Sequence, residues 1–158
     1  MLRRTMSALA LVAGLLAAGL AAPTHAAAAQ TAQVRCEVSG GGSLFNPPYD
    51  YWIDAYATYD SVPGNPGFRQ WTGYSFRLDG VVPPGDQSNV NIRLYDGNVL
   101  IFAWNSPDNI HPRVWYAVHQ GGIHYTTTSA VDDVVSFQAI FDRPRRSDPN
   151  CTTRTPPV

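Results

Sequence analysis

Lysine is absent from this chain of 158 residues, and acidic side chains other than aspartate are nearly absent too. All eleven basic residues are arginine, and Glu37 is the single glutamate beside eleven aspartates. Without lysine the chain cannot form a Schiff base with pyridoxal phosphate, nor supply the lysine of a phosphate-binding loop or of a kinase. These classes of enzyme are therefore excluded.

The first 26 residues have the three parts of a secretory signal peptide. Arg3 and Arg4 precede an apolar run over residues 8–22, and the small residues Thr24 and Ala26 suit a cleavage site. The apolar run is shorter than the roughly 20 residues that a membrane-spanning helix needs. We predict general secretion, cleavage after Ala26, and an extracellular or cell-surface protein with no membrane attachment afterwards.

The charge that remains after cleavage argues against nucleic acid as a partner. Nine arginines then face twelve acids, which gives a formal net charge of −3 with histidine neutral. Nucleic-acid-binding domains instead carry a basic patch that neutralises phosphates. No nucleic-acid partner is therefore expected.

Only two cysteines are present, Cys36 and Cys151. An exported protein meets an oxidising compartment, which favours a disulfide over free thiols or a metal-binding pair. Pairing would also remove the only candidate cysteine nucleophiles. We predict one disulfide that ties the start of the mature domain to its end, with two buried free thiols as the alternative.

Apolar and polar residues alternate with a period of two through most of the mature chain, and clusters of Gly, Pro, Asn and Asp interrupt the pattern. No long stretch has helical spacing. Residues 27–142 are therefore predicted to form an all-β domain, an immunoglobulin-like antiparallel β-sandwich of about eight strands. A jelly roll and a closed barrel are the alternatives. Residues 143–158 are expected to be a polar C-terminal tail tethered by Cys151.

The alternation also assigns side chains to faces, with two-residue hairpin turns expected at Asp96-Gly97 and Gly121-Gly122. The first turn would pair Leu94 with Val99. The positions expected to face the core are Val34, Cys36, Val38, Ile53, Ala55, Ala57, Tyr59, Thr72, Tyr74, Phe76, Leu78, Val90, Ile92, Leu94, Val99, Ile101, Ala103, Val114, Tyr116, Val118, Ile123, Tyr125, Thr127, Val135, Phe137, Ala139 and Phe141.

The chain has eighteen aromatic residues, and the alternation places several of them on outward faces of the strands. Aromatic rings can stack on the C–H faces of sugars, so a carbohydrate or cell-wall polymer is the expected ligand. The stacking residues would be Phe102, Trp104 and Trp115. The polar residues at the edge of this ligand platform would be Asn91, Arg93 and Arg113. Burial of these rings in the core is the competing interpretation.

Signatures of catalysis and of metal binding are scarce. The chain lacks a Gly-x-Ser-x-Gly elbow, a His-Glu-x-x-His pair and a calcium loop, and most aspartates sit in turn settings. His119 and His124 would face each other across a hairpin, but a third metal ligand is missing nearby. We expect a non-catalytic binding module without cofactor or metal. A structural or protein-interaction envelope protein and a small secreted hydrolase are the alternatives.

Overall fold

A computed structural model describes residues 29–118, 125–128 and 132–158. These residues form nine strands: β1 (Gln30–Gly40), β2 (Tyr49–Val62), β3 (Asn65–Gly80), β4 (Asn89–Asp96), β5 (Val99–Asn105), β6 (Tyr116–Val118), β7 (Tyr125–Thr128), β8 (Asp133–Ile140) and β9 (Asn150–Arg154). Within these ranges no helix is long and apolar enough to cross a membrane. The expected signal peptide and the Gly121-Gly122 turn lie outside the described residues.

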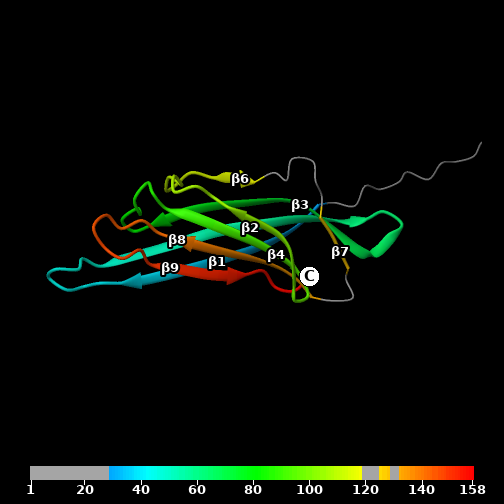
Figure 1. Ribbon diagram of the computed structural model, residues 1–158, viewed down its shortest axis with the longest axis horizontal. Helices are drawn as coiled ribbons and strands as arrows, with labels where there is room; N and C mark the ends of the chain where they lie inside the picture. The colour runs from blue at the N-terminus through cyan, green and yellow to red at the C-terminus, as the bar shows by residue number, and fades with distance from the viewer. Residues whose placement is uncertain (1–28, 119–124, 129–131) are drawn as a thin grey trace, which may run out of the picture.

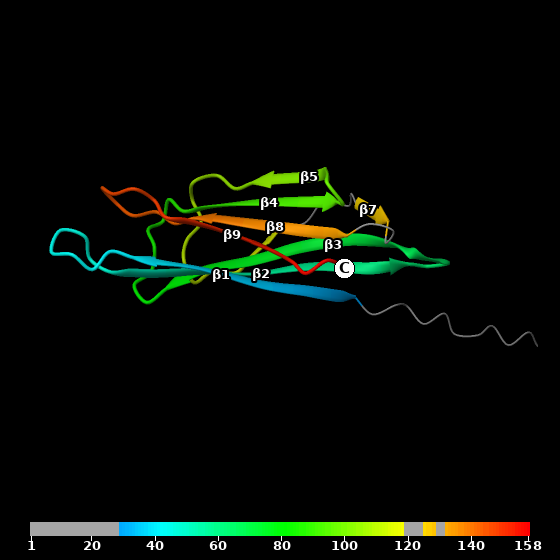
Figure 2. The same cartoon turned by 90° about the horizontal axis from the view of Figure 1, so that it is seen from below.

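The strands form two antiparallel sheets that pack face to face (Figures 1 and 2). One sheet has the order β1-β2-β3-β6, and β7 also pairs with β3; the other has the order β5-β4-β8-β9. The long strand β3 pairs with β7 near its start and with β6 near its end. The predicted all-β sandwich is confirmed, and the described strands do not close into a barrel.

Alternate side chains of β2, β4 and β8 fill the space between the sheets, as the sequence pattern predicts. The pairing of β1 with β2 and of β4 with β8 runs without interruption, so the inward face stays constant along these strands. The fully buried residues on these three strands and just beyond β8 include Ile53, Ala55, Ala57, Val90, Ile92, Leu94, Val135, Phe137, Ala139 and Phe141.

A bulge in β3 overturns the expected alternation, in which Trp71 lies on the face opposite to Tyr74. Thr58 pairs with Gly73 and Tyr59 pairs with Trp71, so Thr72 is an extra residue on β3. Such a bulge shifts the side-chain alternation by one residue. Trp71 therefore lies fully buried with its ring centre 5.0 Å from that of Tyr59, while Thr72, expected inward, hydrogen-bonds the Thr58 carbonyl.

The turn between β4 and β5 lies one residue later than expected. Asp96 pairs with Val99, so Gly97 and Asn98 occupy the turn instead of Asp96 and Gly97. Gly97 has a φ of +58° at the first central position, which a type II′ turn reserves for glycine. The predicted pairing of this hairpin is therefore wrong, and Val99, expected in the core, is exposed.

A second irregularity in the same hairpin turns two aromatic rings inward. Leu94 pairs with Phe102 and Ile92 pairs with Trp104, which leaves Ile101 as a bulged residue without a partner. Phe102 and Trp104 therefore share the face of buried Leu94 and Ile92 and pack against the core. Their expected outward orientation is wrong.

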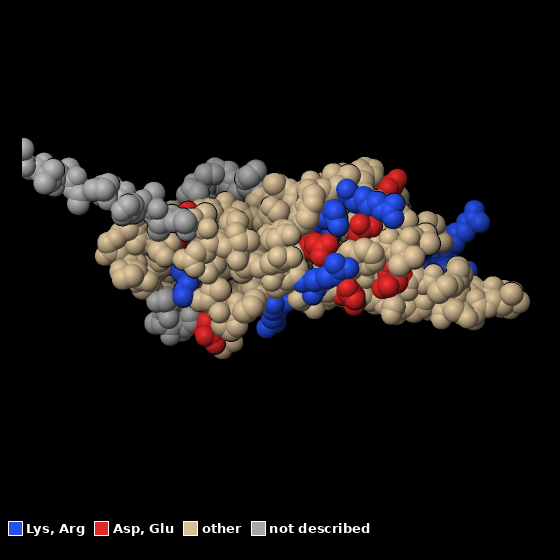
Figure 3. Space-filling view, turned by 180° about the vertical axis from the view of Figure 1, so that it is seen from behind, with Lys and Arg blue, Asp and Glu red and all other residues tan. Residues whose placement is uncertain are grey.

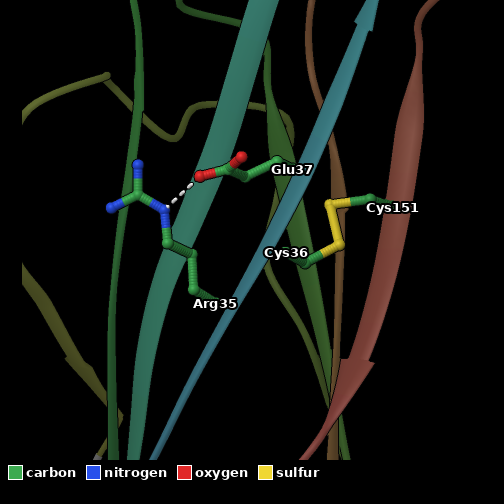
Figure 4. Close-up of a disulfide and its surroundings, with 4 residues drawn as sticks. All are labelled: Arg35, Cys36, Glu37 and Cys151. Atoms are coloured by element: carbon green, nitrogen blue, oxygen red, sulfur yellow. Dashed lines mark hydrogen bonds and ion pairs between the residues drawn. A yellow bond between two sulfur atoms is a disulfide. The ribbon is translucent and has the colours of Figure 1, made fainter.

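The two long sides of the sandwich are closed in different ways. On one side Cys36 of β1 is bonded to Cys151 of β9, with a Cα–Cα distance of 6.1 Å, so the predicted disulfide is confirmed (Figure 4). On the other side the ring of Phe102 stacks on Tyr74 and lies 5.1 Å from the ring of Tyr125. The disulfide links the two sheets and is compatible with an extracellular protein.

Residues 150–154 form a regular edge strand, β9, within the segment that the sequence suggested was a tail. Ala139 pairs with Cys151 and Ser136 pairs with Arg154. Beyond the strand, buried Thr155 donates its backbone N–H to the Val135 carbonyl. The end of the chain is thus part of the second sheet.

We expect Cys36→Ser to lower the free energy of unfolding by roughly 2–5 kcal/mol, because the disulfide restricts the unfolded chain over a separation of 115 residues. Urea denaturation of the oxidised wild type and the variant measures this. Cys151→Ser is the matched control and should give the same loss. Unequal losses, or a stability unchanged in both, would contradict the prediction.

Candidate functional site

The six residues of the expected ligand platform lie in three separate places. Phe102 and Trp104 pack against the core between the sheets. Asn91 and Arg93 lie on the outer face of the β5-β4-β8-β9 sheet, because they alternate with buried Val90 and Ile92. Arg113 and Trp115 lie at the outer face of the opposite sheet. A single platform made of these residues therefore does not exist.

The outer face of the β1-β2-β3-β6 sheet carries a chain of alternating charges, which we call the arginine–carboxylate network. Its ion pairs run from Glu37 to Arg35, Asp54, Arg77, Asp79 and finally Arg113. The N–O distances range from 2.6 Å for Glu37–Arg35 to 3.7 Å for Arg77–Asp79. Figure 3 shows arginine and acidic side chains interspersed on this side of the molecule. Three arginines balance three carboxylates, so the network is neutral as a whole.

Arg113 fixes the loop that leads into β6. Its backbone is in the left-handed region with a φ of +64°, and its N–H donates to the Leu78 carbonyl at 2.7 Å. Its side chain donates from Nε to Asp79 Oδ1 at 3.0 Å and from Nη2 to the Gly80 carbonyl. These bonds offset the strain of the backbone and hold the segment before β6 against the end of β3.

Trp115 lies on this network as a half-exposed indole. Its ring centre is 5.2 Å from that of Tyr56 and 5.5 Å from the Arg77 guanidinium, and 46% of the residue is exposed. Arg35 covers Trp52 in the same way at 4.7 Å. Cations over aromatic faces are attracted by the ring quadrupole, so the network also orients the indoles.

The pKa of Asp79 is lowered by its partners. Burial alone would raise it, but the hydrogen bonds from Gly80 N–H and Arg113, and the positive charges of Arg113 and Arg77, together outweigh burial. Asp79 is therefore ionised over the ordinary pH range and holds Arg113 in place.

A hollow of about 280 Å³ lies on the outer face of the other sheet, and we call it the polar groove. Its lining residues are Asn91, Arg93, Tyr95, Ser136, Gln138, Thr152 and Arg154. They come from β4, β8 and β9, which lie side by side in that sheet. All seven side chains are polar and none is a carboxylate. The β9 contribution was missed at the sequence level because that strand is short and polar.

The arginines of the polar groove have only neutral partners. Arg93 donates to the Trp104 carbonyl at 3.0 Å and to Asn105 Oδ1 at 2.7 Å. The Arg154 guanidinium lies 5.7 Å from the ring centre of Tyr95. No ion pair between described residues involves either arginine. Two positive charges are therefore available to a ligand in the groove.

A buried series of hydrogen-bonded polar side chains lies at the start of β8, and the sequence pattern did not predict it. Trp71 Nε1 donates to Thr127 Oγ1 at 3.0 Å, and this hydroxyl donates to Asp133 Oδ2 at 2.5 Å. Arg69 donates to the same carboxylate oxygen at 3.4 Å. Asp133, at the start of β8, is fully buried. Burial raises its pKa, with a further increase from Asp96, against the hydrogen bond from Thr127 and the charge of Arg69.

The candidate metal ligands His119 and His124 lie outside the described residues. Elsewhere in the described ranges, no group of three or more His, Cys, Asp or Glu side chains is placed to hold a metal ion. His111 instead lies 3.2 Å from Asp86 on the surface.

Comparisons with known proteins give no information on function, so the fold and the surfaces described above are the basis for a functional proposal. No protein-family model matches the chain, and neither a curated protein nor a solved structure matches it significantly.

We expect Arg113→Ala to release Trp115 from its position while changing the free energy of unfolding by less than about 1 kcal/mol, because exposed ion pairs contribute little to stability. The emission of Trp115 is the part of the tryptophan fluorescence that is lost in Trp115→Phe. Acrylamide should quench this emission more strongly in Arg113→Ala than in the wild type. Arg93→Ala, which removes an arginine from the other sheet, should leave that quenching unchanged. Equal quenching in Arg113→Ala and wild type would contradict this role of Arg113.

We expect acid to stabilise the wild type relative to Asp133→Asn. The folded pKa of Asp133 lies above its unfolded value, so the cost of burying the charged form is relieved as the pH falls from neutral through the raised pKa. Urea denaturation between about pH 7 and pH 4 measures the difference between the two proteins. Asp79→Asn should show no trend in this range and the opposite trend only below pH 3.8, the ordinary pKa of an aspartate, since the contribution of Asp79 is lost as the pH falls from there through its lowered pKa.

Proposed function

We propose that this protein is a secreted, non-catalytic binding module that holds an acidic carbohydrate polymer in the polar groove. The observation that carries the proposal is a hollow on a sheet face lined by seven polar side chains, two of them arginines without carboxylate partners. The leader sequence and the disulfide between Cys36 and Cys151 support an extracellular location.

The chemistry of the groove suits a sugar that carries carboxylates. Arg93 and Arg154 can each present a planar pair of N–H donors, the geometry that matches a carboxylate. The side chains of Asn91, Gln138 and Thr152 offer donors and acceptors for hydroxyl groups. Charged and neutral hydrogen-bonding groups along one hollow fit the repeating pattern of acids and hydroxyls in a polyuronate.

The groove favours binding over hydrolysis. Most glycoside hydrolases place two carboxylates on either side of the bond that they cleave, and none of the groove's lining residues is acidic. On the opposite sheet, Asp54 and Asp79 are each bound to two arginines of the arginine–carboxylate network. Those carboxylates act as anchors for the arginines, which supports a module without catalytic function.

A second candidate function rests on Trp115. A half-exposed indole held by Tyr56 and Arg77 offers a stacking surface for a neutral sugar ring or for an envelope protein. This surface and the polar groove lie on opposite faces of the sandwich. Ligands of the two sites can therefore be distinguished by single substitutions.

We expect Arg154→Ala to weaken binding of polygalacturonate roughly tenfold or more, because one charge-assisted contact is lost. Isothermal titration calorimetry with polygalacturonate, and with neutral pullulan as comparison, measures this. Arg146→Ala removes the same charge outside the groove and should retain full affinity. Equal affinity in Arg154→Ala and wild type would refute binding in the polar groove. Loss of affinity in Trp115→Ala alone would assign binding to the indole.

A further inference from the structure

Two large apolar side chains form the tip of the connection between β1 and β2. Ser43 and Asn46 pair as an isolated bridge, so Leu44 and Phe45 occupy the two central positions of the turn. Leu44 is 92% exposed and Phe45 is 80% exposed. Turn positions of this kind usually hold Gly, Asn, Asp or other small polar residues. Leucine and phenylalanine there place apolar surface in solvent without any benefit to the fold.

The tip is held in a defined conformation. The Asn46 carbonyl accepts from Gly42 N–H at 2.7 Å and from Ser43 N–H at 3.1 Å, and Asn46 N–H donates back to the Ser43 carbonyl. Gly41 has a φ of +80°, and a Cβ there would lie 2.4 Å from the Pro47 carbonyl oxygen, so only glycine fits. Leu44 and Phe45 are therefore presented outward by a hydrogen-bonded turn.

A neighbouring loop adds more exposed apolar surface at the same end. Val81 is 72% exposed and Val82 is 64% exposed, directly after β3. Val81 N–H donates to the Asp50 carbonyl at the start of β2, which fixes this loop beside the base of the tip. Four apolar side chains on two adjacent loops thus face solvent at one end of the sandwich.

Arginines from a third loop lie beside the tip. Arg143 donates to Asn46 Oδ1 at 3.0 Å and covers the Tyr49 ring at 4.1 Å, so the loop after β8 is bound to the base of the tip. Arg145 and Arg146 follow it and are exposed. Neither forms an ion pair with a described residue. The nearby carboxylate of Asp148 accepts the backbone N–H of Arg143 instead.

The apolar and basic groups are arranged in order along the long axis of the molecule. In Figures 1 and 2 the β1–β2 turn projects furthest, and the loop over 142–149 lies set back behind it. Figure 3 shows the tip at that end without acidic or basic side chains and arginines behind it. A bilayer surface has the same order, with acyl chains inside and anionic headgroups outside them.

We propose that this end of the molecule docks on an anionic lipid surface. Leu44 and Phe45 insert at the boundary between headgroups and acyl chains, and Arg145 and Arg146 contact lipid phosphates. The surface is independent of the polar groove, since it involves different loops and different residues. The sequence pattern did not reveal it, and we had expected no membrane contact after signal cleavage.

The shape of the surface favours lipid over a folded protein partner. Protein interfaces have a contiguous core of complementary, well-packed surface. Here the two most exposed apolar residues stand on a narrow projecting turn, where a rigid partner would need a matching pocket. A fluid interface accepts a projecting tip without such a pocket, and it supplies negative charge for the unpaired arginines.

The test is co-sedimentation of the folded, disulfide-bonded protein with vesicles of phosphatidylcholine containing about one-third phosphatidylglycerol, and with vesicles of phosphatidylcholine alone. We expect binding to the anionic vesicles, at least about tenfold weaker binding to the neutral ones, and weakening by salt. The double substitution Leu44→Ser and Phe45→Ser should lower binding to anionic vesicles at least about tenfold. Such exposed positions can change without unfolding the domain, which circular dichroism would verify.

The matched control is Val99→Ser with Leu100→Ser, which removes two exposed apolar side chains at the other end of the sandwich and should leave vesicle binding unchanged. Arg154→Ala should also leave it unchanged, which separates this proposal from the polar groove. Absence of binding to anionic vesicles, or binding that survives the tip substitution, would overturn the proposal. Self-association that the tip substitution abolishes, without vesicle binding, would assign the tip to a second copy of the chain.

Discussion

Two stacked sheets can slide or separate unless their long sides are closed, and this requirement organises the molecule. One side is closed by a covalent bond between Cys36 of β1 and Cys151 of β9. The other side is closed by aromatic packing, in which Phe102 of the second sheet stacks on Tyr74 of the first. The inward phenylalanine requires the bulge in β5, so the closure also determines the side-chain order of that strand. The outer faces are then free to carry an arginine–carboxylate network on one sheet and an unneutralised polar groove on the other.

The sequence pattern predicts the sandwich, the disulfide and the inward faces of β2, β4 and β8, because β2 pairs with β1, and β4 with β8, without interruption. It fails at Trp71 and at Phe102 and Trp104. In both cases a single unpaired residue, Thr72 or Ile101, reverses the alternation. Since side chains alternate with a period of two, one extra residue exchanges the inward and outward sets. Nothing local in the sequence marks these bulges, because they are set by pairing with a neighbouring strand.

The candidate site was predictable only in part, for a related reason. Asn91 and Arg93 were placed on an outward face correctly, since β4 itself is regular. They share the groove with Thr152 and Arg154, which come from a strand about sixty residues further along the chain. Which strands become neighbours is decided by the order of the sheet, and alternation along one strand carries no information about that order. The structure therefore has a polar groove formed by three strands where the sequence pattern predicted an aromatic platform.

The position of Cys151 within the last strand has a mechanical consequence. A pulling force on the chain outside the two cysteines passes through the sulfur atoms, so the 115-residue span between them bears no load. Thr152 and Arg154 lie beyond Cys151 and are held by the pairing of β9 with β8, by the hydrogen bonds that follow it and by the contact of Arg154 with the Tyr95 ring. A pulling force therefore acts directly on these two residues, as it does on residues 30–35 of β1 ahead of Cys36. The groove's second arginine thus lies in a part of the fold that the disulfide does not shield from force.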